Sequence, residues 1–153
     1  MIKTAGDRTG LTIAELVERT EKRALPIIQK EAAIEEVIDA FAGSTHTRVL
    51  YVLDDQGRLV GVISLGQLVR HVFSAYHEPS IHPRRLMGLI ASETAGDLMR
   101  NEAVSSRLDE QVSDVLQRMI RANIKEIAIL DDDRRVVADL TMVDFLQIYE
   151  TGE

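Results

Sequence analysis

Apolar side chains recur along the chain at two different periods, and each period occurs twice. Residues 34–41 carry them at positions i, i+3, i+4 and i+7, and residues 112–119 repeat this spacing 78 positions later. Charged side chains fill the opposite face, which is typical of an amphipathic helix that packs on a core. Short aliphatic runs follow each helix at 49–53, 59–63, 127–130 and 136–140. Because a polar segment separates the runs of each pair, they predict two β-hairpins.

The two halves of the chain align as an internal repeat. Thr12 corresponds to Thr94 at an offset of 82 residues, and Ser64 corresponds to Thr141 at an offset of 77. The first copy is therefore about five residues longer, mostly around 18–26. We expect three segments, which are a first repeat with an N-terminal helix at 1–73, a linker with a short helix at 74–93, and a second repeat at 94–153.

Three local patterns refine this expectation. Gly57 suits the first hairpin turn, whereas Arg134 stands at the equivalent position, so we expect the second turn to be built differently. The run Asp131–Asp133 is interpreted as this turn, because an EF-hand calcium loop needs alternating ligands and a distal glutamate. The last helix of each repeat is expected to bury an apolar stripe that includes Val69 in the first copy and Leu146 in the second.

Composition narrows the classes of function. The net charge of −7 argues against binding to nucleic acid, which needs a basic face, and the absence of cysteine excludes disulfides and thiolate chemistry. No stretch approaches the roughly 18 apolar residues of a membrane span. We therefore expect a cytoplasmic protein that binds neither nucleic acid nor membrane.

The linker contains a histidine pair that invites a metal hypothesis. His77 and His82 have one residue too many between them for a metalloprotease helix, and Pro79 disfavours the helix that such a site requires. With His71 nearby, an incidental metal site is the alternative to ordinary linker histidines, which we favour. The sequence thus predicts no metal site.

The repeated unit, a short helix followed by strand, amphipathic helix, hairpin and a Ser/Thr-initiated helix, resembles the CBS (cystathionine β-synthase-type) domain family. Two such units in tandem form a Bateman module. The resemblance implies an α/β (α+β) fold of two β-α-β-β-α units about a pseudo-twofold axis, with adenosine-containing ligands in the clefts between them. The sequence departs from the family in lacking a proline near Leu50 and Ala128, and in having Ala138 where the first copy has Gly61.

The same resemblance implies a binding site. It assigns the hydroxyl of Thr141 to the phosphate or ribose of the ligand and the carboxylate of Asp144 to the ribose hydroxyls, with Ser64 and Gln67 as the weaker first-copy equivalents. The adenine is expected against four residues of the second copy, which are Val104, Ser105, Ile124 and Ile127. The alternatives are structural. A Ser/Thr with an acceptor side chain three positions later also caps a helix, and such aliphatic residues also form cores.

Asp139 bears on the charge of the ligand. It shares a strand face with Thr141, so its carboxylate would repel phosphate unless a cation such as Mg²⁺ or an arginine intervenes. Four cations are candidates, namely Arg48, Arg70, Arg121 and Lys125. If Asp139 points into the cleft, AMP or S-adenosylmethionine is favoured over ATP.

The sequence allows three functions. The resemblance favours a stand-alone regulatory module that senses AMP, ADP, ATP or S-adenosylmethionine, requires no cofactor, forms a homodimer and signals to an effector protein. The main alternative is a dimerisation or partner-docking scaffold with empty clefts. An enzyme that uses Asp139, Asp144 and a histidine has no matched acid–base spacing behind it, so we expect no catalytic activity.

Overall fold

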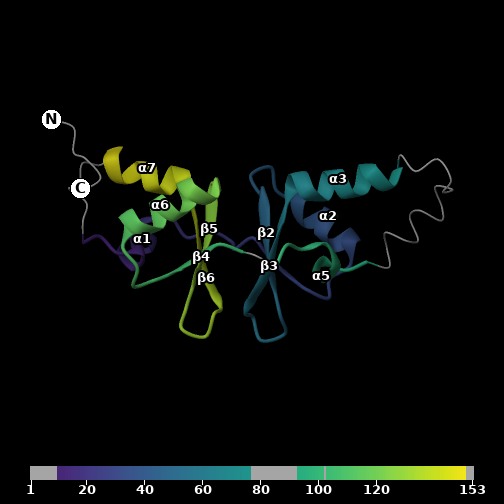
Figure 1. Cartoon of the computed structure of the whole chain (residues 1–153), viewed down its shortest axis with the longest axis horizontal. Coiled ribbons are helices and arrows are strands. Elements are labelled where there is room, and N and C mark those ends of the chain that lie inside the picture. Colours follow the sequence, from purple (N-terminus) through teal and green to yellow (C-terminus); the bar gives the residue numbers. More distant parts are fainter. Residues whose placement is uncertain (1–9, 77–92, 102, 151–153) are drawn as a thin grey trace. The chain divides into compact units, whose positions relative to one another are not determined.

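A computed structural model describes residues 10–76, 93–101 and 103–150 of the chain (Figure 1). In order along the chain, its elements are α1 (Ile13–Arg19), β1 (Ile27–Gln29), α2 (Ile34–Ala42), β2 (Val49–Leu53), β3 (Leu59–Ser64), α3 (Leu65–Tyr76), α5 (Ala95–Leu98), β4 (Ser105–Arg107), α6 (Val112–Ala122), β5 (Glu126–Leu130), β6 (Val136–Thr141) and α7 (Met142–Glu150). The β-α-β-β-α order from β1 to α3 recurs from β4 to α7. The predicted mixed α/β fold is confirmed.

Each repeat contains one three-stranded sheet with a parallel and an antiparallel pair. The strand orders are β1-β2-β3 and β4-β5-β6, so the hairpin strand that follows the amphipathic helix is central in both. In the second sheet, Ile127 pairs with Leu140 and Glu126 pairs with Thr141, the last residue of β6. This register places Thr141 where the sheet ends and α7 begins.

The two compact units of the structure do not coincide with the two sequence repeats. Residues 1–25 group with 104–153, and residues 26–103 form the other unit. Helix α1 is joined to the second repeat by a backbone bridge between Thr12 and Gln111, and the start of α5 is joined to the first repeat by the equivalent bridge between Ala33 and Thr94. The repeats have therefore exchanged their leading helices.

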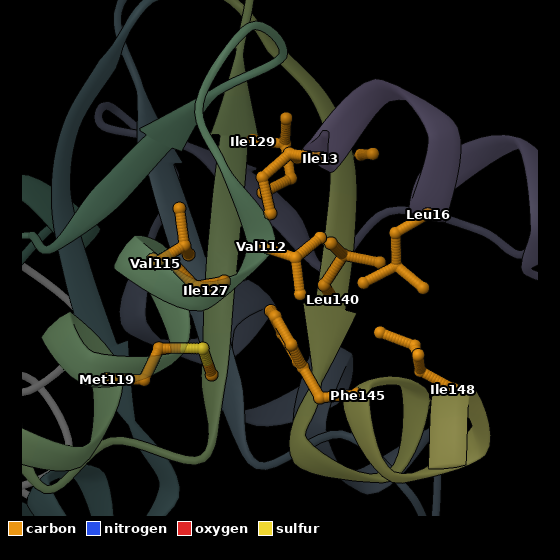
Figure 2. Packing of buried hydrophobic residues seen from close by; sticks show 11 residues of the cluster. Ile13, Leu16, Val112, Val115, Met119, Ile127, Ile129, Leu140, Phe145 and Ile148 are labelled. Atoms are coloured by element: carbon orange, nitrogen blue, oxygen red, sulfur yellow. The ribbon is translucent and has the colours of Figure 1, made fainter. Parts of the chain in front are cut away.

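The core of the unit that contains the second repeat shows this exchange directly (Figure 2). Ile13 and Leu16 of α1 lie among the buried side chains of α6, β5, β6 and α7. Ile13, Ile127 and Leu140 are fully inaccessible to solvent. In the other unit, Ala95 of α5 is likewise buried against the core. Burying an isoleucine or leucine side chain contributes roughly 1.5–3 kcal/mol, so α1 is an integral part of the second repeat's stability.

The two hairpin turns are built alike, contrary to our expectation. The carboxylate oxygen Oδ1 of Asp131 accepts hydrogen bonds from the backbone N–H groups of Asp133 and Arg135, both at 2.9 Å. Asp54 binds the equivalent N–H groups of the first turn at 2.9 Å. Arg134 adopts φ +66°, close to the +79° of Gly57. The shared aspartate fixes the turn, and Arg134 accepts a left-handed backbone to satisfy it.

The apolar stripes of the last helices are rotated from their expected positions. Leu68 and Phe145 are buried, but Val69 is 43% exposed and Leu146 is 65% exposed. One turn beyond Phe145, the buried residue is Ile148. The expectation that Val69 and Leu146 are buried was wrong, because α3 presents Leu65, Leu68 and Val72 to the core and α7 presents Met142, Phe145 and Ile148.

Two absences concern only the residues that the structure describes. Within them, no helix combines the length and the apolar character that crossing a membrane would require. No group of three or more histidine, aspartate or glutamate side chains is arranged there to hold a metal ion. The histidines at 77 and 82 and the expected short linker helix at 84–91 lie outside the described residues.

Candidate functional site

The candidate site begins where β6 ends and α7 starts. The Thr141 backbone N–H donates to Asp144 Oδ2 at 2.8 Å, and the Asp144 backbone N–H donates to the Thr141 hydroxyl oxygen at 3.4 Å. These reciprocal bonds form a capping box, which satisfies free N–H groups at the helix start. Asp144 is only 4% exposed. The two residues that the sequence singled out therefore lie together, and their mutual bonds hold the carboxylate in one orientation.

Asp144 is also paired with an arginine that the sequence did not indicate. Arg23 lies between α1 and β1, and its Nη2 is 2.6 Å from Asp144 Oδ2, while its Nη1 donates to Oδ1 at 3.4 Å. The same Nη2 donates to the backbone carbonyl of Asp139 at 2.8 Å. The hydrogen bond to Asp144 raises the pKa of the Arg23 guanidinium above its ordinary value. One side chain thus bridges the start of α7 and strand β6.

Two further carboxyl groups surround this pair. Asp139 is 7% exposed, and Glu126 faces the same region from the start of β5. Burial raises the pKa of the Glu126 carboxyl to about 9, and its hydrogen bond to Asp139 together with the charges of Asp139 and Asp144 acts in the same direction. The nearby Arg23 opposes this shift. At neutral pH, Glu126 is therefore protonated and hydrogen-bonded to Asp139.

A pocket of about 410 Å³ lies beside the bridge. It is lined by Val17, Glu18, Thr20, Glu21, Lys22, Arg23, Leu25, Val137, Ala138 and Asp139. Its wall combines aliphatic side chains from α1, the following segment and β6 with charged groups at the rim. Such a mixture suits a small ligand that has an apolar ring and a polar end.

The equivalent position of the first copy is arranged differently. The Ser64 hydroxyl oxygen accepts from the Gln67 backbone N–H at 3.2 Å, as expected of a capping residue. The Gln67 side chain, however, donates its amide N–H to the Leu98 carbonyl rather than completing a capping box. Its Oε1 is buried and has no hydrogen-bond partner among the described residues. A neutral side chain tied to the backbone therefore stands where the second copy has a carboxylate.

The residues proposed to contact adenine lie in and around the second sheet. Ile127 is a core residue of β5, and Val104 and Ile124 are half-buried against the same core. Ser105 begins β4, where its backbone carbonyl accepts from Arg118 Nη1 at 2.8 Å. Each of them has a structural role. Their contact with a ligand stays a prediction.

Arg23 was not among the four cations proposed near Asp139; it pairs with the carboxylate of Asp144 and reaches Asp139 only at its backbone carbonyl. Arg48, one of the four candidates, donates to the Thr45 carbonyl at 2.9 Å instead. Arg23 was missed because it is 121 residues from Asp144 in sequence, and only the exchange of α1 brings it near. The one available signal was the extra length of the first copy around 18–26.

A CBS domain model matches residues 13–74 and 95–150. The chain spans about a quarter of the length of the curated relatives that it matches. One of these is protein sds23 from Neosartorya fischeri, which is 22% identical over 148 residues that cover 94% of this chain and 26% of that protein.

Three solved structures share the fold. A CBS domain-containing protein from Thermotoga maritima (TM0935) aligns with a TM-score of 0.70 and 23% identity over 95% of this chain and 98% of its own. CBSX2 in complex with AMP aligns with a TM-score of 0.72 and 18% identity, over 93% of this chain and 98% of its own. The CBS domain pair of MJ0100, in complex with 5′-methylthioadenosine and S-adenosyl-L-methionine, aligns with a TM-score of 0.67 and 18% identity. The alignment covers 94% of this chain and 98% of that one. At these identities the likeness establishes the fold alone.

Proposed function

Because the chain belongs to the CBS domain family, we propose that it is a regulatory module that binds an adenosine-containing ligand at Thr141 and Asp144. AMP, ADP, ATP and S-adenosylmethionine are the candidate ligands, and Mg²⁺ could accompany a nucleotide. The proposal includes no catalysed reaction and places the module in the cytoplasm. The observation that carries it is the buried, pre-oriented carboxylate of Asp144, which two protein contacts hold in one orientation beside a pocket.

The chemistry of the site fits such a ligand. A carboxylate can accept a hydrogen bond from each hydroxyl of a ribose diol, and the first turn of the nine-residue helix α7 favours negative groups. The solved relatives CBSX2 and MJ0100 were determined with AMP and with S-adenosyl-L-methionine, which supports the same ligand class here. The acidic Asp139 beside the site favours the less negative members of this class.

Thermal shift against AMP, ADP, ATP and S-adenosylmethionine tests the proposal. A ligand at 100 times its dissociation constant should raise the free energy of unfolding by about 2.7 kcal/mol. We expect an upward shift with at least one of these compounds, and we expect Asp144→Ala to abolish it. Asp97→Ala is the matched control, since Asp97 completes a capping box with Thr94 at the start of α5 and belongs to the other compact unit. A flat response of the wild-type protein to all four compounds would refute ligand sensing.

One observation favours a second function, that of a dimerisation or docking scaffold. Large apolar side chains are exposed on the last helix of both repeats, with Phe73 57%, Val143 60% and Leu146 65% accessible. Exposed aliphatic and aromatic side chains of this size favour association. A homodimer through these helices, or an effector protein docked on them, is compatible with ligand sensing. It becomes the whole function if no ligand binds.

A further inference from the structure

Arg23 binds the carboxylate of Asp144, which is the group that the proposed ligand needs. Its guanidinium donates to both oxygens of Asp144 and, through Nη2, to the Asp139 carbonyl. A ribose diol offers its two hydroxyl donors to the same kind of acceptor. A ligand that binds both oxygens of Asp144 through its diol therefore competes with Arg23 for this carboxylate.

The first repeat shows what Arg23 replaces. Val62 is the counterpart of Asp139, and it exchanges two backbone hydrogen bonds with Arg100, at 3.0 and 2.9 Å. Those bonds seat the chain directly on β3, where a Cβ added to Gly61 would lie 2.8 Å from the Arg100 carbonyl oxygen. In the second repeat, Ala138 stands in place of Gly61, and the Asp139 carbonyl is bound by the Arg23 side chain at 2.8 Å. A side-chain bridge has taken the place of a backbone bridge.

Because of this difference, the partner of Asp139 can be released more easily than the partner of Val62. Freeing Val62 requires the backbone around Arg100 to move away from the sheet, whereas freeing Asp139 and Asp144 requires only a change of rotamer at Arg23. The Arg23 side chain is 41% exposed, so its guanidinium can turn outward into water. Asp144 keeps its two bonds from Thr141 when it does so, and the carboxylate stays oriented for a new partner.

We propose that Arg23 is a built-in competitor for Asp144 that closes this site in the free protein and must swing away before a ligand with a vicinal diol binds. This inference rests on the proposed function and concerns the regulation of its site. The affinity of the ligand is reduced by the fraction of molecules in which Arg23 is engaged. Displacement also releases the segment between α1 and β1 from β6, which gives ligand binding a structural consequence.

Calorimetric titration with adenosine tests the competition, because adenosine has the diol but no phosphate that could attract Arg23. We expect Arg23→Met to bind adenosine about tenfold more tightly than the wild type, and Arg23→Lys to show a smaller gain because an ammonium lacks the planar fork. Lys22→Met is the matched control, since it removes an adjacent positive charge that lines the same pocket. The gain should shrink for 2′-deoxyadenosine, which has lost one hydroxyl.

A measurement on the unaltered protein covers the case in which Arg23→Met fails to fold. Saturating adenosine should move the guanidinium ¹⁵N resonances of Arg23 to the values of solvent-exposed arginines. If adenosine binding needs Asp144 but is equal or weaker in Arg23→Met, or if the Arg23 resonances do not move, the competition is refuted and ligand sensing stands. If adenosine and the four compounds named above bind none of the variants, both proposals fall.

Discussion

The protonated Glu126 makes folding stability depend on pH in an unusual direction. Its pKa is about 9 in the folded protein against an ordinary value of 4.5. Between these values the folded state holds a proton that the unfolded state has lost, so stability is complete below pH 4.5 and falls as the pH rises toward 9. Most carboxyl groups in proteins act in the opposite sense, because pairing lowers their pKa.

The size of the effect follows from the linkage relation. One proton of difference costs about 1.4 kcal/mol per pH unit, so the limit between pH 6 and pH 8 is about 2.7 kcal/mol. Glu126 is only partly buried, and solvent screening reduces this limit to about 1–2 kcal/mol. Glu126→Gln keeps the shape and the hydrogen-bonding capacity of the neutral acid but cannot ionise, so it should lose little stability over this range.

Urea unfolding followed by circular dichroism at pH 6, 7 and 8 measures the difference. We expect the wild type to lose about 1–2 kcal/mol relative to Glu126→Gln as the pH rises. Glu36→Gln, an exposed change on α2, is the control and should follow the wild type. The contributions of other titrating groups to the pH dependence are the same in the wild type and in each variant, so they cancel in these comparisons. Equal pH dependence in the wild type and Glu126→Gln would show that Glu126 is ionised in the folded state and would refute the reasoning.

Three further predictions concern the turns, the first sheet and the last helix. Arg134→Gly should stabilise the protein by about 0.5–1 kcal/mol in urea unfolding, because it relieves a left-handed backbone. Gly61→Ala should destabilise it by about 1–3 kcal/mol, since the added Cβ would lie 2.8 Å from the Arg100 carbonyl oxygen, and Ala138→Gly is the milder counterpart. Leu146→Asp should convert the expected homodimer to a monomer in size-exclusion chromatography with light scattering, with little change in stability because the side chain is 65% exposed.

Each of these predictions has a result that would contradict it. A loss of stability in Arg134→Gly would mean that the entropy of a flexible turn outweighs the relief of strain. Equal changes in stability for Gly61→Ala and Ala138→Gly would contradict the distinction between the backbone bridge of the first repeat and the side-chain bridge of the second. A Leu146→Asp protein with unchanged mass, or a neighbouring exposed control Gln147→Asp with the same effect, would show that α7 is not the dimer surface.

The internal repeat determined which features of the structure could be predicted from the sequence. Hydrophobic periodicity and the near-constant offset were sufficient for both hairpins and for the helix start at Thr141, because these depend on residues close together in one copy. The parallel strands β1 and β4 and the placing of Asp144 came from the family resemblance. The turn at Arg134 was misjudged because a side-chain carboxylate, rather than the residue at the left-handed position, determines it. The pairing of Arg23 with Asp144 could not be foreseen, since it depends on which unit receives α1.

The exchange of leading helices has a consequence for the order of events during synthesis. The Gly10 backbone N–H donates to Gln111 Oε1, a partner 101 residues further along the chain. Residues 26–103 form a continuous unit and can complete their core while the C-terminal part is still being made. Helix α1 must wait with its apolar face unsheltered until β4 through α7 have emerged, so it reaches its native place after residues 26–103, although it is translated before them.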